Sequence, residues 1–389
     1  MLAPEGWSYA SALPVDGDDP GRFNALFGRD SLITSLQLLE VRPDVARCTL
    51  RTLAALQGRQ DDPLTDEEPG KIVHEYRPEP DARFEARAWS SLIRDGELRY
   101  YGSADSTPWF LVVLASLGDA AIANELEDSW RAAGDWLERA LEHGGGLVRY
   151  GPRTVPGGLV HQGWRDTSDP LDPAGHGGGI LREDGMPPEP PIADADTQAV
   201  ALAGLRALAA LRGDDRAGEA ATALAARIEE HFGPETMAVE AGDREVKGAG
   251  SQLGWLLWAG ALSPAATARA ADRLCRPDIL TPFGLRTLSD LHPQFAPAAY
   301  HRGAVWPFDS WIGWGGLCAA GREEEAEQVR TGVLEALERL GLAPELYAVT
   351  DEGPERVPIA NQIQAWTVGA RWALENRWDG RRLPGHGRG

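Results

Sequence analysis

Two carboxylic acids in this sequence stand where an acid–base pair could form. Asp166 lies in the segment GLVHQGWRDTSDPLD, directly after a tryptophan and an arginine. A carboxyl group beside an aromatic wall can keep its proton near neutral pH, as a general acid must. Glu345 is a lone acid in the otherwise apolar segment GLAPELYAVT. Spacing alone leaves a structural alternative open for each: an acidic turn for Asp166 and a solvent-facing position for Glu345.

The composition indicates which substrates such a pair could act on. The chain has 389 residues and a formal net charge of −21. This charge repels phosphate backbones and disfavours nucleic acid as a partner. The chain also has 14 tryptophans, and indole rings stack well on the apolar faces of sugars and bases. With nucleic acid disfavoured, the expected substrate is a small sugar or oligosaccharide.

The same composition indicates a compartment. The longest apolar runs fall short of the roughly 18 residues that a membrane span needs, and the opening MLAPEGWSYA lacks the features of a secretory signal. Cys48, Cys275 and Cys318 form neither a zinc-binding spacing nor a disulfide framework, and Cys48 and Cys318 are expected to be buried in helices. We expect a cytoplasmic protein without membrane contact, metal or cofactor; the sequence does not indicate its oligomeric state.

Helical periodicity dominates the chain, and strand signals are sparse. The expected helices alternate between two kinds. One kind starts with a polar or aromatic cluster and suits an inner layer, whereas the other is alanine-rich with a charged face and suits an outer, solvated layer. The inner helices are expected near 29–41, 106–118, 195–212, 251–261, 304–319 and 363–377. The outer helices are expected near 43–57, 120–143, 215–232, 263–275 and 321–340.

A closed ring of paired helices accounts for this arrangement better than an open solenoid, because the spacing of the inner helices is too variable for a regular repeat. In a ring of parallel inner helices, all the polar clusters lie at one rim, together with the long loops. These loops are 58–105, 144–193, 276–303 and 341–362. A sixth outer helix would have to come from residues 1–25, which have the composition of a loop, or be absent. We expect one all-α domain over 1–389, with 1–25 as an N-terminal loop segment and 379–389 as a C-terminal tail.

A series of motifs occurs in order across nearly the whole chain. They are FGRDSLIT (27–34), PGKIVHEYRP (69–78), STPWF (106–110), QGWRDTSD (162–169), FGLRTLS (283–289), YHRGAVWPFDSW (300–311), PELY (344–347) and IQAW (363–366). Together they resemble the catalytic domain of bacterial glycogen-debranching-type amylo-α-1,6-glucosidases. Related (α/α)6-barrel glycosidases are the glucoamylases, the processing α-glucosidases and the mannosylglycerate or glucosylglycerate hydrolases.

The resemblance implies an (α/α)6 barrel and an inverting, exo-acting α-glycosidase. Asp166 matches the general acid of these enzymes, and Glu345 matches the general base. Inversion needs two carboxyl groups about 6.5–9.5 Å apart, so that a water molecule fits on the far face of the sugar ring. Asp166 would protonate the glycosidic oxygen, and Glu345 would deprotonate the water that attacks C1.

The resemblance and the chemistry of the side chains together indicate the substrate-binding groups. Arg29 and Asp30 match an arginine–aspartate pair that grips sugar hydroxyls, for which a buried pair offers fixed donors and acceptors. His301 has no second histidine or cysteine at ligand spacing, so a hydrogen bond to sugar is favoured over metal binding. Asp194 and Asp196 either reach the pocket or only cap a helix. The expected substrate-binding residues are Arg29, Asp30, His74, Glu75, Arg77, Trp164, Arg165, Tyr300, His301, Trp306, Gln364 and Trp366. Trp130, Trp255, Trp258 and Trp372 are expected to pack in the core.

Departures from the debranching enzymes leave the specificity open. Those enzymes carry an upstream β-rich domain, whereas this chain begins almost at the barrel, and IQAW and GSQLG (250–254) replace their usual motifs. The favoured hypothesis is release of glucose from an α-glucoside, and the alternative is a mannosylglycerate- or glucosylglycerate-type hydrolase, which has the same minimal layout. Two alternatives of other classes are a sugar epimerase, which would rely on paired histidines, and a non-catalytic sugar-binding protein, which would not need both carboxylates.

Overall fold

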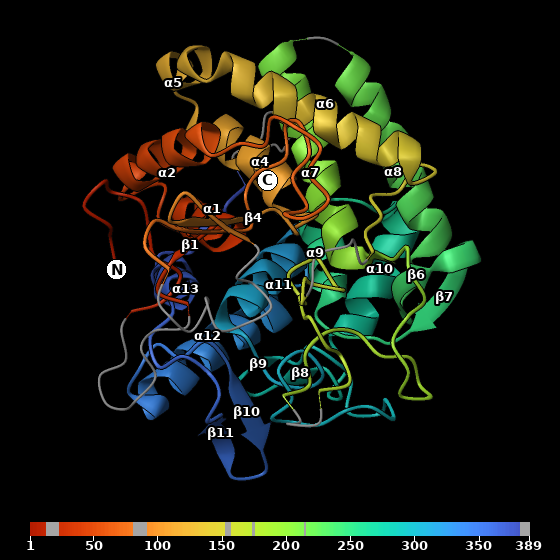
Figure 1. Ribbon diagram of the computed structural model, residues 1–389. Coiled ribbons are helices and arrows are strands. Elements are labelled where there is room, and N and C mark those ends of the chain that lie inside the picture. Colours follow the sequence, from red (N-terminus) through yellow and green to blue (C-terminus); the bar gives the residue numbers. More distant parts are fainter. Residues whose placement is uncertain (13–22, 81–91, 152–156, 173–175, 214, 382–389) are drawn as a thin grey trace.

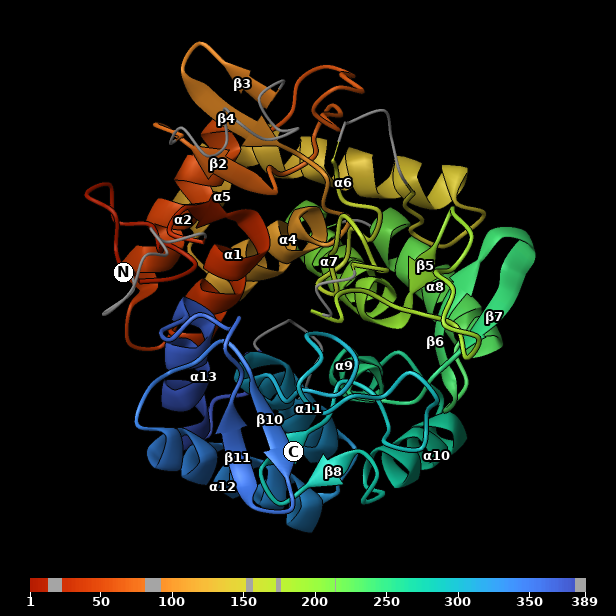
Figure 2. The ribbon, with the colours of Figure 1, turned by 60° about the horizontal axis from the view of Figure 1, so that its bottom comes forward.

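Six helices stand side by side in a closed ring (Figure 2). The computed structural model describes residues 1–12, 23–80, 92–151, 157–172, 176–213 and 215–381. The ring consists of α1 (Gly28–Gln37), α4 (Ser106–Leu117), α7 (Ala195–Arg212), α9 (Gln252–Trp258), α11 (Pro307–Ala319) and α13 (Ala365–Glu375). Each helix contacts the next, and α13 returns to contact α1. The expected inner layer and its closure are therefore confirmed.

The outer helices cover this ring and face solvent (Figure 1). They are α2 (Pro43–Ala55), α5 (Ala120–Glu125), α6 (Glu127–His143), α8 (Arg216–His231), α10 (Pro264–Leu274) and α12 (Glu323–Leu340). The difference between the layers follows from their residues. In α4 nearly every side chain is apolar and buried, because helices pack on both of its sides, whereas α6 buries only one stripe that includes Trp130, Ala133 and Leu137.

Since α5 and α6 together take the place of the one outer helix expected over 120–143, the described residues contain no further outer helix from the N-terminal segment. Residues 1–12 instead form an irregular segment that contains Pro4 and Gly6, both poor residues for a helix interior. This segment buries Trp7. It is tied to the start of α13 by a hydrogen bond of 2.8 Å from the Ala365 N–H to the Ala10 carbonyl.

Short strands occur in the loops, so the fold is mostly helical rather than strictly all-α. One sheet has the order β1 (Leu26–Phe27), β2 (Glu75–Arg77), β4 (Glu97–Tyr100), β3 (Ile93–Arg94), and a second has β5 (Ala193–Asp194), β6 (Thr236–Glu240), β7 (Arg244–Lys247). The hairpins β8 (Leu280–Thr281) with β9 (Gly284–Leu285) and β10 (Tyr347–Thr350) with β11 (Gly353–Arg356) complete the set. All neighbouring strands are antiparallel. The β1–β2 and β5–β6 pairings join segments from different loops, and the first of them places the motif around Glu75 beside the start of α1 through the Phe27–Glu75 pairing.

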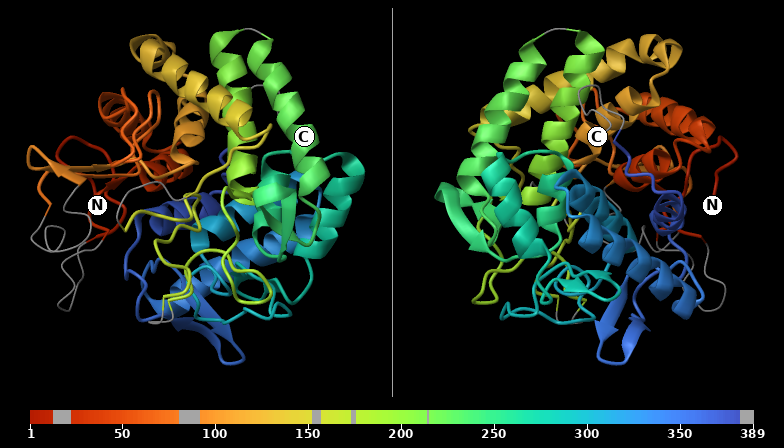
Figure 3. Two further views of the ribbon diagram at one scale, coloured as in Figure 1. Left: turned by 45° about the vertical axis from the view of Figure 1, so that its right-hand side comes forward. Right: turned by 180° about the vertical axis from the view of Figure 1, so that it is seen from behind.

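The long loops gather at one end of the ring, as Figure 3 shows for the segment before α7 and for the β10–β11 hairpin. The residues after α13 pack across other ring helices. The indole N–H of Trp378 donates to the Leu36 carbonyl at 2.8 Å, and the indoles of Trp311 and Trp258 donate to the carbonyls of Trp378 (2.7 Å) and Asp379 (2.9 Å). Residues 378–379 thereby tie together α1, α9 and α11. The rest of the expected tail, 382–389, lies outside the described residues.

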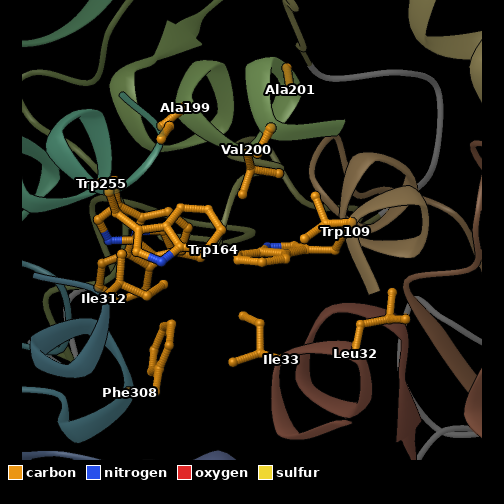
Figure 4. Close-up of a cluster of buried hydrophobic side chains, with 14 of the residues drawn as sticks. Leu32, Ile33, Trp109, Trp164, Ala199, Val200, Ala201, Trp255, Phe308 and Ile312 are labelled. Atoms are coloured by element: carbon orange, nitrogen blue, oxygen red, sulfur yellow. The ribbon is translucent and has the colours of Figure 1, made fainter. Parts of the chain in front are cut away.

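The centre of the ring is a continuous apolar core rich in tryptophan. Trp164 lies there beside Trp255, with Trp109, Ile33 and Phe308 around them (Figure 4). The rings of Trp164 and Trp255 stack 6.0 Å apart and almost parallel. Trp164 is thus held rigidly by the inner helices, although it comes from a loop.

Other expectations about the fold have mixed outcomes. None of the helices in the described part of the chain is long and apolar enough to cross a membrane. The cysteines are free thiols, but the prediction that Cys48 and Cys318 are buried is wrong: Cys48 is half-buried and Cys318 is exposed. Cys318 lies in the last turn of α11, where the helix leaves the core. Apart from the missing outer helix and the small sheets, the architecture is the expected (α/α)6 barrel.

Candidate active site

A cavity of about 450 Å³ lies at the loop end of the ring. Both expected catalytic carboxylates, Asp166 and Glu345, line it. The expected substrate-binding residues that also line it are Arg29, Asp30, His74, Glu75, Arg77, Trp164, Tyr300, His301, Trp306, Gln364 and Trp366. The first turns of α1 and α13, the segment that leads into α11 and the strand β2 carry many of these side chains. Residues from distant parts of the chain therefore meet in one cavity.

Asp166 is held from one side by Arg29. The Arg29 guanidinium makes an ion pair with Asp166 and donates to both carboxylate oxygens of Asp105, at 3.0 and 3.1 Å. Asp105 also accepts a hydrogen bond of 2.7 Å from the Ser103 hydroxyl. The side chain of Asp166 remains 25% exposed, whereas those of Arg29 and Asp105 are almost fully buried. Asp105 thus balances the charge of Arg29, and Asp166 keeps access to solvent.

Glu345 has different surroundings. It is only 2% exposed. The Tyr300 hydroxyl donates to Oε1 at 2.6 Å, and the backbone and side-chain N–H groups of Asn361 donate to Oε2 at 3.2 and 3.3 Å. Donors aimed at carboxylate oxygens stabilise the ionised form, which is the form that a general base needs.

The charges of both Asp166 and Glu345 influence the pKa of the Asp30 carboxyl. Burial raises the pKa of its carboxyl to about 8, Arg29 opposes this rise, and the negative charges of Asp166 and Glu345 add to it. The Gln364 side-chain amide donates to Asp30 at 3.3 Å, and Asn361 donates in turn to Gln364 at 3.0 Å. A chain of hydrogen bonds therefore joins the start of α1 to the surroundings of Glu345.

Asp30→Asn is expected to raise the stability of the ligand-free protein at alkaline pH. The folded pKa of about 8 lies above the ordinary value of 3.8, so stability from Asp30 is complete below pH 3.8 and is lost as pH rises towards 8. Asparagine has no charge to bury and can still accept the Gln364 hydrogen bond. The melting temperature of Asp30→Asn should exceed that of the wild type by a few degrees near pH 9, and the gap should shrink towards pH 4. A pH-independent gap would contradict this account.

The histidines of the cavity are held as neutral rings. Burial is the main cause that lowers the pKa of both His74 and His301 well below 6.5. The Gly179 N–H donates to Nδ1 of His301 at 2.9 Å, so in the neutral ring Nε2 carries the proton. Nε2 of His74 lies 4.0 Å from the carboxylate of Asp166. His301 is thus a hydrogen-bond donor rather than a cation.

The tryptophans of the cavity differ in whether their N–H groups are already used. The indole N–H of Trp306 donates to the Tyr300 carbonyl at 2.7 Å. The indole nitrogens of Trp164 and Trp366 are buried and have no hydrogen-bond partner among the residues that the structure describes. A buried donor without a partner is costly, and both rings line the cavity, so these two N–H groups are suited to donate to a bound sugar.

Trp366→Phe should raise KM or lower kcat so that kcat/KM falls about 10-fold, because the change leaves one sugar hydroxyl without its donor. The matched control is Trp130→Phe in the outer helix α6, whose indole N–H donates to the Ala123 carbonyl. The control should alter only stability. Equal kcat/KM values for Trp366→Phe and the wild type would show that this N–H does not contact substrate.

Arg165, Asp194 and Asp196 lie outside the cavity lining. Arg165 was expected to contact substrate, but its guanidinium is buried against Asp196, with the Arg165 Nε 2.8 Å from the Asp196 carboxylate. Asp194 caps α7 through the backbone N–H of Thr197 at 2.8 Å. Of the two roles considered for Asp194, helix capping is the one that the geometry supports.

Several cavity residues were not predicted from the sequence. They are Phe23, Phe27, Gly157, Leu159, Thr167, Ser168, Asp169, Asp172, His176, Gly178 and Ile359. Phe27, Thr167 and Ser168 stand inside motifs already singled out. Their motif membership was a usable signal, whereas Phe23 and Ile359 have no local sequence feature that marks them.

The described residues give no indication of a metal centre. They contain no group of three or more His, Cys, Asp or Glu side chains that could hold a metal ion. The cavity therefore offers carboxylates, neutral histidines and indoles as its reactive and binding groups.

Comparisons with known proteins place the chain in a family. The profile described as mannosylglycerate hydrolase MGH1-like glycoside hydrolase domain matches residues 30–367. No match was found among curated proteins. Since the profile spans most of the chain, the expected relationship to glycosidases is confirmed, whereas the match does not support the amylo-α-1,6-glucosidase type specifically.

Solved structures from Thermus thermophilus share the fold. The GH63 mannosylglycerate hydrolase in complex with Tris and D-glycerate has 17% identity and a TM-score of 0.69 over 96% of both chains. The same hydrolase in complex with glucose has 17% identity and a TM-score of 0.63 over 95% of this chain and 96% of that one. An uncharacterized conserved protein has 17% identity and a TM-score of 0.66 over 96% and 97%. On the strength of the profile match and this shared barrel, the chain belongs to the MGH1-like family of glycoside hydrolases.

Proposed function

We propose that this glycoside hydrolase cleaves the α-glycosidic bond of a short glycoside of the mannosylglycerate or glucosylglycerate type, with inversion at C1. Asp166 is the general acid and Glu345 the general base. The observation that carries the proposal is that both carboxylates line one cavity but stand in contrasting surroundings. Glu345 is buried among three donors, and Asp166 is partly exposed beside a guanidinium.

The surroundings suit these two roles. Glu345 receives three hydrogen bonds, which stabilise its ionised form, so it is prepared to take a proton from water. An ion pair with a guanidinium favours the ionised form of a carboxyl group, so Asp166 serves as the acid when substrate draws Arg29 away; it reaches solvent, from which it can take up the proton that it passes to the glycosidic oxygen. Sugar hydroxyls that bind Arg29 would compete with Asp166 for the guanidinium, and Asp105 would keep that guanidinium in place.

The size of the cavity supports a short substrate. Its volume of about 450 Å³ falls within the usual range of small-molecule sites, roughly 300–1,000 Å³. Trp306 and Trp366 provide apolar faces for sugar rings, and Arg29, Asp30 and Gln364 provide donors and acceptors for hydroxyls. This combination favours one or two sugar-sized units over a long chain.

The epimerase alternative is less compatible with the cavity. Histidines that act as acid and base work best with pKa values near the operating pH. Burial lowers the pKa of His74 and His301 well below that range. The carboxylates are therefore the better acid–base pair.

The proposal is tested by following hydrolysis with proton NMR. Mannosylglycerate, glucosylglycerate, isomaltose, maltose, kojibiose and trehalose are offered separately, and the first anomer of the released sugar is recorded before mutarotation. We expect one of the two glycerate glycosides to be the best substrate and the β-anomer to appear first. Initial release of the α-anomer would overturn the inverting mechanism, and preference for isomaltose would restore the α-1,6-glucosidase hypothesis. Binding without hydrolysis of any glycoside would favour a sugar-binding protein.

A further inference from the structure

The Arg165 guanidinium donates hydrogen bonds to four groups of the protein. Its side chain is almost completely buried. Nε donates to the carboxylate of Asp196 at 2.8 Å, and Nη2 donates to the Ser251 hydroxyl at 2.9 Å. Nη1 donates to the carbonyls of Thr287 at 3.0 Å and His301 at 3.3 Å. All three guanidinium nitrogens are thus engaged with the protein.

These partners come from separate parts of the rim. Asp196 lies in the first turn of α7, and Ser251 immediately precedes α9. Thr287 and His301 belong to the segment between β9 and α11. Since the guanidinium is planar and its N–H groups point in fixed directions, Arg165 fastens the segment that contains Asp166 to three other segments at once.

Arg165 also supports the floor of the cavity. Its guanidinium carbon lies 4.4 Å from the centre of the Trp164 ring. Trp164 stacks on Trp255 from the inner helix α9. The chain neighbours of Arg165 are Trp164, which lines the cavity, and Asp166, the expected general acid.

We propose that Arg165 is a positioning residue for the general acid, an inference that rests on the proposed function of Asp166. Arg29 holds the Asp166 carboxylate from the side of the cavity, and Arg165 holds the peptide that carries it. Proton transfer to the glycosidic oxygen requires the acid to lie within hydrogen-bond reach of that oxygen, and a displacement of about 1 Å can cost roughly 100-fold in rate. Asp196 and Ser251 take part by fixing the guanidinium.

The test is the dependence of Arg165→Lys on the leaving group. Lysine keeps the positive charge, but one ammonium group cannot reach acceptors spread over a planar fork. We expect kcat to fall roughly 100-fold on the best glycerate glycoside, with KM changed little. Turnover of the matching α-glycosyl fluoride should fall far less, because fluoride departs with less help from an acid. A general loss of structure would lower both rates equally.

The matched control is Arg206→Lys. Arg206, on α7, also donates to backbone carbonyls, but these belong to Ala259 and Gly260, which follow the end of α9 that is distant from the cavity. Both substrates should be turned over at wild-type rates by this control. If Arg165→Lys does not fold, as judged by circular dichroism, Ser251→Ala removes one of the four acceptors of Arg165 and should show the same leaving-group pattern with a smaller loss.

Two outcomes overturn the inference. One is equal loss of Arg165→Lys activity on the glycoside and the fluoride, and the other is undiminished turnover of the glycoside. Asp166→Asn, assayed in parallel, separates this failure from that of the proposed function. Full activity of Asp166→Asn would show that Asp166 is not the general acid. An inactive Asp166→Asn together with equal losses for Arg165→Lys would contradict only the positioning role of Arg165.

Discussion

Glu345→Gln is expected to lower kcat by a factor of roughly 10²–10⁴ while leaving the fold and KM nearly unchanged. The amide cannot take a proton from the attacking water. Its oxygen can still accept the hydrogen bond from the Tyr300 hydroxyl, but its NH2 group then faces the two N–H donors of Asn361, so the stability of the variant is measured as well. The measurement is steady-state hydrolysis of the best glycoside from the substrate screen, combined with a thermal melt.

Azide gives this prediction a second readout. Azide needs no deprotonation before it attacks C1, so added azide should restore turnover of Glu345→Gln and yield the β-glycosyl azide. The matched control is Glu240→Gln on β6, a buried glutamate that accepts hydrogen bonds from arginines outside the cavity. Glu240→Gln should lose stability but keep kcat. Wild-type turnover in Glu345→Gln would contradict the assignment of Glu345 as the general base. An inactive variant that azide does not rescue would indicate a role of Glu345 in binding or folding instead.

Asp166→Asn should abolish hydrolysis of glycosides with poor leaving groups, again by roughly 10²–10⁴ in kcat. Without a proton, the departing oxygen leaves as an alkoxide, which is a high-energy group. The α-glycosyl fluoride of the same sugar should retain most of its turnover, because fluoride needs little acid assistance. The measurement is the ratio of the two kcat values in the variant and in the wild type.

The control for Asp166→Asn is Asp278→Asn. Asp278 is also an aspartate paired with an arginine, since Arg273 lies 2.9 Å from its carboxylate, but it lies outside the cavity lining. Its substitution should leave both substrates equally active. Equal losses of Asp166→Asn on glycoside and fluoride would argue that Asp166 binds substrate rather than protonating the leaving group.

The two catalytic predictions depend on different parts of the structure. Glu345 is fixed by the loop that contains Tyr300 and by Asn361, near the start of α13. Asp166 is fixed by Arg29 on α1 and by the segment that Arg165 anchors. A variant that disturbs one carboxylate can therefore leave the other in place, which is why leaving-group and azide tests can separate them.

The layered helices could be predicted from the sequence because their signals are local. Apolar residues spaced at the helical period mark the buried stripe of α6, and the uninterrupted apolar run of α4 marks a helix covered on both sides. The polar clusters at the starts of the inner helices indicated a common rim, since parallel helices in a ring bring their N-termini together. The motifs then indicated which side chains meet there.

Hydrogen-bond partners could not be predicted in this way, because they depend on contacts between segments far apart in the chain. Arg165 stands beside Asp166 in a catalytic motif, yet its partners Ser251 and His301 arrive from other loops and turn it away from the cavity. Trp306 and Trp366 occupy similar positions in the sequence, each at the start of an inner helix. Only the tertiary structure gives the Trp306 N–H a carbonyl and leaves the Trp366 N–H without one.

The ring of helices, the end at which the cavity lies and many of the side chains that line it could therefore be predicted from the residues alone. Helix periodicity and helix-start clusters are properties of neighbouring residues, so they survive in a one-dimensional pattern. The tertiary structure decided which of those side chains face the cavity and which brace it. It also decided the short strand pairings and the packing of residues 378–379 across α1, α9 and α11, because each requires backbone groups from distant segments to satisfy one another.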